Sequence, residues 1–104
     1  MHSIDNLKRL PQFATLSTKA TRQFWQYDQA ALADGAIPKK YKELMAIAVA
    51  LTTQCLYCIE VHKKNALEAG ATEEEFAETI HVAGALRAGA AITHGTHLLN
   101  DSVA

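Results

Sequence analysis

The spacing of apolar residues indicates helices along the whole chain, since no segment alternates apolar and polar residues as a strand would. A first helix is expected over residues 4–10, ended by Pro11. A loop through Thr15 then leads to a second helix over residues 17–33. In that helix a single apolar stripe repeats at helical spacing, formed by Ala20, Phe24, Tyr27 and Ala31.

A third helix begins at Pro38 and is apolar on every side over residues 44–51, which predicts that it is buried. Thr52 and Thr53 mark a short break, and a fourth helix is expected over residues 53–69. The break is short, so these two helices are predicted to form an antiparallel hairpin at the centre of the fold.

Thr72 and Glu75 form a capping-box signature for a fifth helix. Residues 84–89 begin and end with glycine, which predicts a kink or a split before a last helix over residues 88–100. The pattern therefore predicts one all-α domain of five to six helices, spanning residues 1–104.

Composition narrows the cellular setting and the partners. The formal net charge of -1 gives no reason to expect nucleic acid or an anionic membrane as a partner. Residues 1–10 are charged and polar, unlike a signal peptide, and the apolar run at residues 44–51 is too short to span a bilayer. We therefore expect a cytoplasmic protein, in which a C-x-x-C pair is metal-binding or catalytic more often than a structural disulfide.

The two cysteines of the chain form such a pair. Cys55, Cys58 and His62 are spaced i, i+3 and i+7, which places them on one face of a helix. Cys55 falls in the first turn, where free backbone N–H groups favour a thiolate, and His62 can exchange a proton with Cys58. A thiolate can attack a peroxide or a disulfide, and the second thiol can then close a disulfide. The helix dipole favours Cys55 as the attacking sulfur and closeness to His62 favours Cys58, so the order stays open.

Glu43 joins this group through the register of the predicted hairpin. If the chain turns at Thr52 and Thr53, residues whose numbers sum to about 105 face each other, with Glu43 and His62 each roughly 14 Å from the turn. Glu43 is then placed to orient His62 and to raise its basicity. The candidate catalytic residues are Cys55, Cys58, His62 and Glu43.

Other chemistries fit the sequence less well. Two cysteines on a buried helix can be small hydrophobic residues, and a structural zinc site needs four ligands where the motif supplies three. Haem attachment requires a histidine where Ile59 stands. His94 and His97 could touch one metal, but a surface and an interface position suit them better, and the role of His81 stays open. We therefore expect neither a metal nor a cofactor.

Residues 37–86, which contain the run P-K-K-Y-K-E-L-M-A-I-A-V-A-L-T-T-Q-C-L-Y-C-I-E-V-H, resemble the carboxymuconolactone decarboxylase superfamily and within it the alkylhydroperoxidase D-like branch. That branch has the pattern E-x11-C-x2-C-x3-H, matched here by Glu43, Cys55, Cys58 and His62. Two features depart from some relatives: the chain has the length of one domain, and Tyr57 stands where those relatives have a histidine.

The resemblance implies an all-helical domain that assembles as a trimer or hexamer. It also implies reduction of a small hydroperoxide through a disulfide between the two cysteines, without haem, flavin or metal, and re-reduction by a dithiol or lipoyl-type reductant protein. A homo-oligomer is also expected because the second helix carries apolar residues on two sides.

Two other functions stay open beside thiol-dependent peroxide reduction. One is a lactone decarboxylase-like enzyme that uses Glu43 and His62 as acid and base, although the decarboxylases generally lack the cysteine pair. The other is a helical oligomer without catalytic activity that acts as a thiol redox sensor. The sequence names neither the peroxide nor the physiological reductant.

Overall fold

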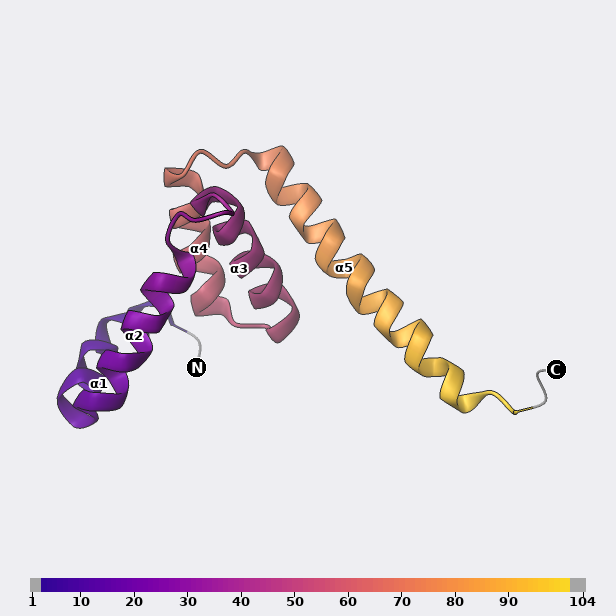
Figure 1. Cartoon of the computed structure of the whole chain (residues 1–104), viewed down its shortest axis with the longest axis horizontal. Coiled ribbons are helices and arrows are strands. Elements are labelled where there is room, and N and C mark those ends of the chain that lie inside the picture. The colour runs from indigo at the N-terminus through magenta and orange to yellow at the C-terminus, as the bar shows by residue number, and fades with distance from the viewer. Residues whose placement is uncertain (1–2, 102–104) are drawn as a thin grey trace.

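The computed structural model describes residues 3–101, and all regular secondary structure in that range is helical (Figure 1). The prediction of an all-α protein with five to six helices is therefore confirmed. In chain order the elements are η1 (Ile4–Arg9), α1 (Pro11–Leu16), α2 (Thr18–Leu32), α3 (Lys39–Thr53), α4 (Leu56–Glu68), α5 (Glu73–Gly95) and η2 (Thr96–Leu98), where η marks a 3₁₀ helix.

The centre of the molecule is the hairpin of α3 and α4, which lie side by side in Figure 1. Buried apolar side chains between these helices and the start of α5 form a small core, and Phe76 packs against it. Apolar burial of this kind is the main stabilising contribution in a small domain. The buried core residues are Leu44, Ile47, Ala66 and Ala71.

The turn of this hairpin lies later than the sequence predicted. Thr52 and Thr53 belong to α3, because their hydroxyl groups donate to the carbonyl oxygen of Val49 and leave the helix intact. The chain reverses at Gln54, which adopts the left-handed conformation with φ of 59°. As a result Cys55, and not Thr53, is the N-cap residue of α4.

The N-terminal prediction was wrong in one segment. Pro11 does not lead into a loop but begins α1, since the first position of a helix needs no backbone N–H donor. Ser17 then separates α1 from α2, and its N–H donates to the carbonyl oxygen of Phe13. The first half of the chain is therefore more helical than its residue pattern suggested.

The prediction for the C-terminal half was partly wrong. The capping box of Thr72 and Glu75 is present. Gly84 and Gly89, however, neither kink nor split α5, which runs without a break from Glu73 to Gly95. An isolated glycine weakens a helix by only about 1 kcal/mol, and the neighbouring alanines favour helix strongly enough to continue it.

The single chain is elongated. Its Cα radius of gyration is 17.9 Å, whereas a compact chain of this length would have about 13 Å. α5 contacts α3 near its start and then extends away from the other helices (Figure 1). Because the chain is open, α3 is not buried on every side as predicted, and Met45 and Val49 are about half exposed.

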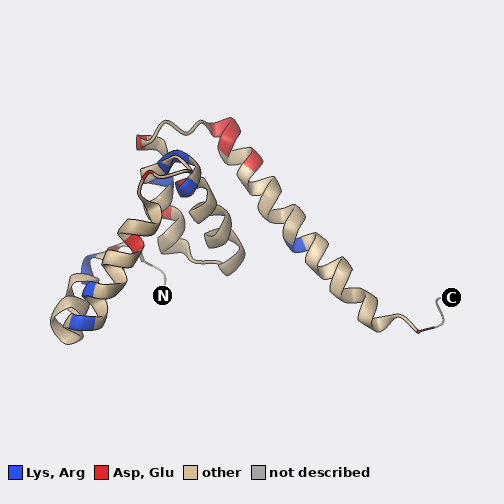
Figure 2. Cartoon of the chain, viewed as in Figure 1, with Lys and Arg blue, Asp and Glu red and all other residues tan. Residues whose placement is uncertain are grey.

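No helix of residues 3–101 is long and apolar enough to cross a membrane. Charged residues on α5 gather in its first turns, and between Thr79 and Gly95 Arg87 is the single Lys, Arg, Asp or Glu residue (Figure 2).

Candidate thiol site

Cys55 and Cys58 meet at the N-terminus of α4. Cys55 is the N-cap residue and not a residue of the first turn, so its side chain takes the place that a serine or aspartate oxygen usually fills. Its Sγ accepts a hydrogen bond of 3.3 Å from the backbone N–H of Cys58. Both cysteines are half-buried free thiols in this structure.

The pKa values of the two thiols are shifted in opposite directions. The side chain of Cys58, and then its backbone N–H, donate to the sulfur of Cys55 and lower the pKa of the Cys55 thiol. The same side-chain hydrogen bond, burial and the negative charge on Cys55 raise the pKa of Cys58 to about 11. The first proton of the pair is therefore lost more readily from Cys55, and Cys58 keeps its proton to higher pH.

Glu43 and His62 form the contact that the hairpin register predicted. Oε2 of Glu43 lies 2.6 Å from Nδ1 of His62, across the interface between α3 and α4. The Glu43 side chain is fully buried, and that of His62 is 17% exposed. A carboxylate on Nδ1 favours the tautomer with its proton there, which leaves Nε2 free to accept a proton.

Lys39 completes this group and was missed by the sequence reasoning. Its Nζ lies 3.2 Å from Oε1 of Glu43, one helical turn away, and 3.5 Å from the carbonyl oxygen of Leu32 at the end of α2. Each oxygen of the buried carboxylate thus has its own partner. The i, i+4 spacing of a lysine and a glutamate was the available signal, but it is common on exposed helices and points to no particular site.

A cavity of about 430 Å³ opens beside Cys58, between η1, α2 and α4. Its volume lies in the range of small-molecule sites, about 300–1,000 Å³. Cys58 and His62 both line it, whereas Cys55 and Glu43 do not. The full lining is Asn6, Leu7, Leu10, Phe24, Trp25, Asp28, Tyr57, Cys58, Val61 and His62.

Tyr57, which stands where some relatives have a histidine, is a wall of this cavity. Its hydroxyl group accepts a hydrogen bond of 2.9 Å from Nδ2 of Asn6, which ties η1 to α4. Asn6 and Asp28 were not singled out in the sequence, because their distance along the chain from the cysteine pair gives no sign of their place. The fold alone brings these residues to Cys58.

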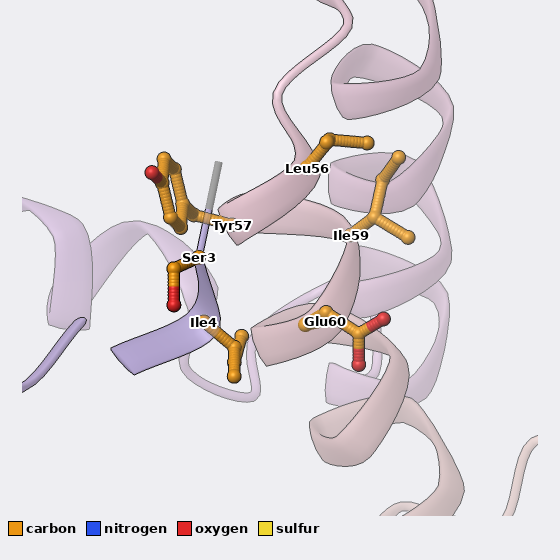
Figure 3. Close-up of a pocket in the computed structure, with 6 residues that line it drawn as sticks. All are labelled: Ser3, Ile4, Leu56, Tyr57, Ile59 and Glu60. Carbon is orange, nitrogen blue, oxygen red and sulfur yellow. The ribbon is translucent and has the colours of Figure 1, made fainter. Parts of the chain in front are cut away.

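A second hollow of about 400 Å³ lies on the other side of Tyr57. Figure 3 shows its lining, contributed by the start of η1 and the first turns of α4: Ser3, Ile4, Leu56, Tyr57, Ile59 and Glu60. It contains neither a thiol nor an imidazole. The cavity beside Cys58 is therefore the better candidate for the reacting centre.

Among the described residues, His81, His94 and His97 do not line this cavity. The rings of His94 and His97 approach each other at the end of α5 and in η2, with centroids 6.0 Å apart. Within residues 3–101, no three His, Cys, Asp or Glu side chains are grouped as metal ligands.

Fold and site together define an all-α protein with a cysteine pair at a helix N-terminus, beside a buried glutamate–histidine pair. The sequence profile of the carboxymuconolactone decarboxylase family matches residues 18–101. The chain belongs to this family, as the resemblance of its central motif predicted.

Similar proteins agree with this assignment. An uncharacterized protein of the cox locus of Paracoccus denitrificans is 47% identical over 76 residues, which cover 73% of this chain and 68% of that protein. An uncharacterized protein of Cupriavidus necator is 39% identical over 54 residues, 52% of this chain and 48% of its own length.

Two solved structures share the fold. The crystal structure of a carboxymuconolactone decarboxylase family protein from Legionella pneumophila matches with a TM-score of 0.74 and 36% identity, over 79% of this chain and 73% of that one. A protein from Methanobacterium thermoautotrophicum matches with a TM-score of 0.78 and 30% identity, over 85% of this chain and 99% of its own.

Proposed function

We propose that the chain is a thiol-dependent hydroperoxide reductase of the alkylhydroperoxidase D-like type. The observation that carries this proposal is the shared cavity: Cys58 and His62 line it together, and Cys55 lies behind Cys58 within hydrogen-bonding reach. An attacking sulfur, a base and a second thiol are the three groups that such a reaction needs.

In the first step a hydroperoxide occupies the cavity and His62 takes the proton of Cys58. The Cys58 sulfur attacks the terminal peroxide oxygen, the O–O bond breaks, and the leaving alkoxide takes a proton from His62 and departs as an alcohol. Cys58 is then a sulfenic acid. Glu43 acts as a positioning residue, because its Oε2 holds Nδ1 of His62 and stabilises the imidazolium that forms between the two proton transfers.

In the second step Cys55 attacks the sulfur of the Cys58 sulfenic acid. A disulfide forms and hydroxide leaves, to be protonated to water. The backbone N–H of Cys58 donates to the Cys55 sulfur and favours its nucleophilic thiolate form. A dithiol, free or as a lipoyl-type group on a carrier protein, then reduces the disulfide and is itself oxidised to a disulfide.

We also propose that the chain works as a homo-oligomer, and the family resemblance points to a trimer or hexamer. Beyond Phe76, the large apolar side chains of α5 are more than half exposed in the single chain, and exposed apolar surfaces mark interaction sites. A second copy is the partner that supplies a matching apolar surface. The exposed residues are Ile80, Val82, Leu86 and Ile92.

The test of the activity is peroxide consumption with several dithiol donors by wild type, Cys55→Ser and Cys58→Ser. We expect turnover only in wild type. A dimedone probe for sulfenic acid should label Cys58 in Cys55→Ser after one equivalent of peroxide and should label nothing in Cys58→Ser. Full turnover by both variants would exclude thiol chemistry.

One alternative enzyme function has a specific observation in its favour. The Glu43–His62 pair reaches the cavity through His62 and could act as acid and base on a lactone without either thiol. Lactone turnover that persists in the double variant Cys55→Ser/Cys58→Ser would establish this reading. A disulfide that forms reversibly and changes assembly, with no turnover of any substrate, would instead indicate a redox sensor.

A further inference from the structure

The carboxylate of Asp28 lines the cavity beside Cys58 and has no part in the mechanism above. Asp28 forms no ion pair with any of residues 3–101. It lies on α2, on the side of the cavity that faces Cys58 and His62 on α4. A carboxylate without a counter-charge gives the cavity a negative potential, which attracts cationic ligands and repels anionic ones.

Apart from the thiols, the other charged groups beside the cavity cancel each other. Lys39 and Glu43 carry opposite charges and contact each other, so the group behind His62 is neutral while His62 itself is neutral. No lysine or arginine lines the cavity. Among the lining groups that are charged before the thiol reacts, Asp28 therefore sets the sign of the field.

The other walls are mainly apolar. Leu7 and Leu10 come from the N-terminal segment, Phe24 and Trp25 from α2, and Val61 from α4. The hydroxyl group of Tyr57 and the side-chain amide of Asn6 add two polar groups, which are hydrogen-bonded to each other. The cavity therefore suits a ligand with an apolar body and no negative charge.

We propose that Asp28 is a specificity-determining residue, which selects neutral or cationic apolar ligands for reaction at Cys58 and excludes anionic ones. This inference deepens the proposed function and rests on it for Cys58 as the attacking sulfur. The charge of Asp28 also contributes to the raised pKa of Cys58, as expected for a carboxylate within electrostatic reach of the sulfur. For a hydroperoxide substrate, the expected class is a neutral alkyl or aryl hydroperoxide and not one that bears a carboxylate.

The test uses Cys55→Ser, in which Cys58 is the single thiol, and two alkylating reagents of nearly equal size, neutral iodoacetamide and anionic iodoacetate. The ratio of the two alkylation rate constants reports the electrostatic potential at the Cys58 sulfur. A changed pKa of Cys58 alters both rates alike and cancels in this ratio. The comparison is made with Cys55→Ser/Asp28→Asn and with Cys55→Ser/Glu78→Gln, which removes one acidic charge from α5, a helix that packs on α3.

At low ionic strength we expect iodoacetamide to be preferred by about threefold or more over the preference of a small free thiol, from charges several ångströms apart. This excess should disappear in Asp28→Asn, persist in Glu78→Gln, and shrink in Cys55→Ser as salt rises toward 1 M. An unchanged ratio in Asp28→Asn, or an equal loss in Glu78→Gln, would overturn the inference.

The salt series on Cys55→Ser decides the question even if Asp28→Asn does not fold, since a ratio independent of salt would also overturn it. Alkylation needs no peroxide turnover. A charge-dependent ratio without peroxide consumption would therefore refute only the proposed function, and peroxide consumption with no charge dependence would refute only the role of Asp28.

Discussion

Oε2 of the buried Glu43 lies 2.6 Å from Nδ1 of His62, although nineteen positions separate the two residues in the chain. The contact joins α3 to α4 and leaves the opposite edge of the imidazole for the cavity that Cys58 also lines. It links the fully buried carboxylate of Glu43 to the cavity beside Cys58, and several measurable consequences follow from this contact and from its neighbours.

The two thiols should lose their protons at different pH values. In wild type, one thiol should react with iodoacetamide at a pH below that of an ordinary cysteine, because Cys58 donates to the sulfur of Cys55 and lowers its pKa. Cys58→Ala should raise the pKa of Cys55, and Cys55→Ala should lower the pKa of Cys58 from about 11, since each variant removes the shared hydrogen bond. The measurement is the pH dependence of alkylation, with each site followed by mass spectrometry. Identical curves for the two cysteines would contradict the shared proton.

Glu43 and His62 should act as one unit. His62→Ala removes the base beside Cys58, so thiol alkylation should shift to higher pH and peroxide turnover should fall by about 10²- to 10⁴-fold. Glu43→Gln keeps the size of the side chain but loses its charge, and a smaller effect of the same sign is expected. The double variant should be little worse than His62→Ala, because residues of one unit are not additive. Fully additive losses would show that Glu43 acts independently of His62.

Lys39 should be a positioning residue that acts through Glu43. Lys39→Met leaves Oε1 of a fully buried carboxylate without its charged partner, and we expect a loss of about 1–3 kcal/mol in the free energy of unfolding. The pH profile of thiol alkylation should move in the same direction as in Glu43→Gln. Lys39→Arg should retain most of the wild-type stability and most of the wild-type alkylation profile, since it keeps the positive charge.

A matched control for this variant is Lys42→Met. Lys42 also bonds a carbonyl oxygen at the end of α2, that of Ala33 at 2.7 Å, but among the described residues its side chain forms no ion pair with Glu43. It should lower stability without a shift in the alkylation profile. Equal pH profiles of thiol alkylation for Lys39→Met and Lys42→Met would show that Lys39 only holds the end of α2 and does not act through Glu43.

Assembly should depend on the apolar part of α5. Leu86 is 68% exposed in the single chain, and Leu86→Glu should convert the oligomer to smaller species, because a charge would have to be buried at the interface. Ala77→Glu introduces the same side chain into the acidic first turns of α5 and should leave the assembly intact. Light scattering at micromolar concentration measures both variants. A monomeric wild-type protein would contradict the proposal.

Much of this molecule could be predicted from local sequence, because helices are built from contacts within one or two turns. The capping box at Thr72, the face shared by Cys58 and His62, and the opposition of Glu43 and His62 all follow from helical spacing together with a short turn. Even a turn displaced to Gln54 did not spoil that pairing, although Glu43 is about three helical turns and His62 about two from it, since shifts along a hairpin are small against side-chain reach.

Tertiary structure alone decided what surrounds the reactive sulfur. Asp28 and Asn6 reach the cavity because α2 and η1 fold back onto α4, and no periodic signal links positions so far apart. Lys39 had a readable spacing, but only the burial of Glu43 turned a common surface pair into a part of the site. Burial, charge and cavity shape depend on contacts between distant segments, and these contacts exist only once the helices have packed.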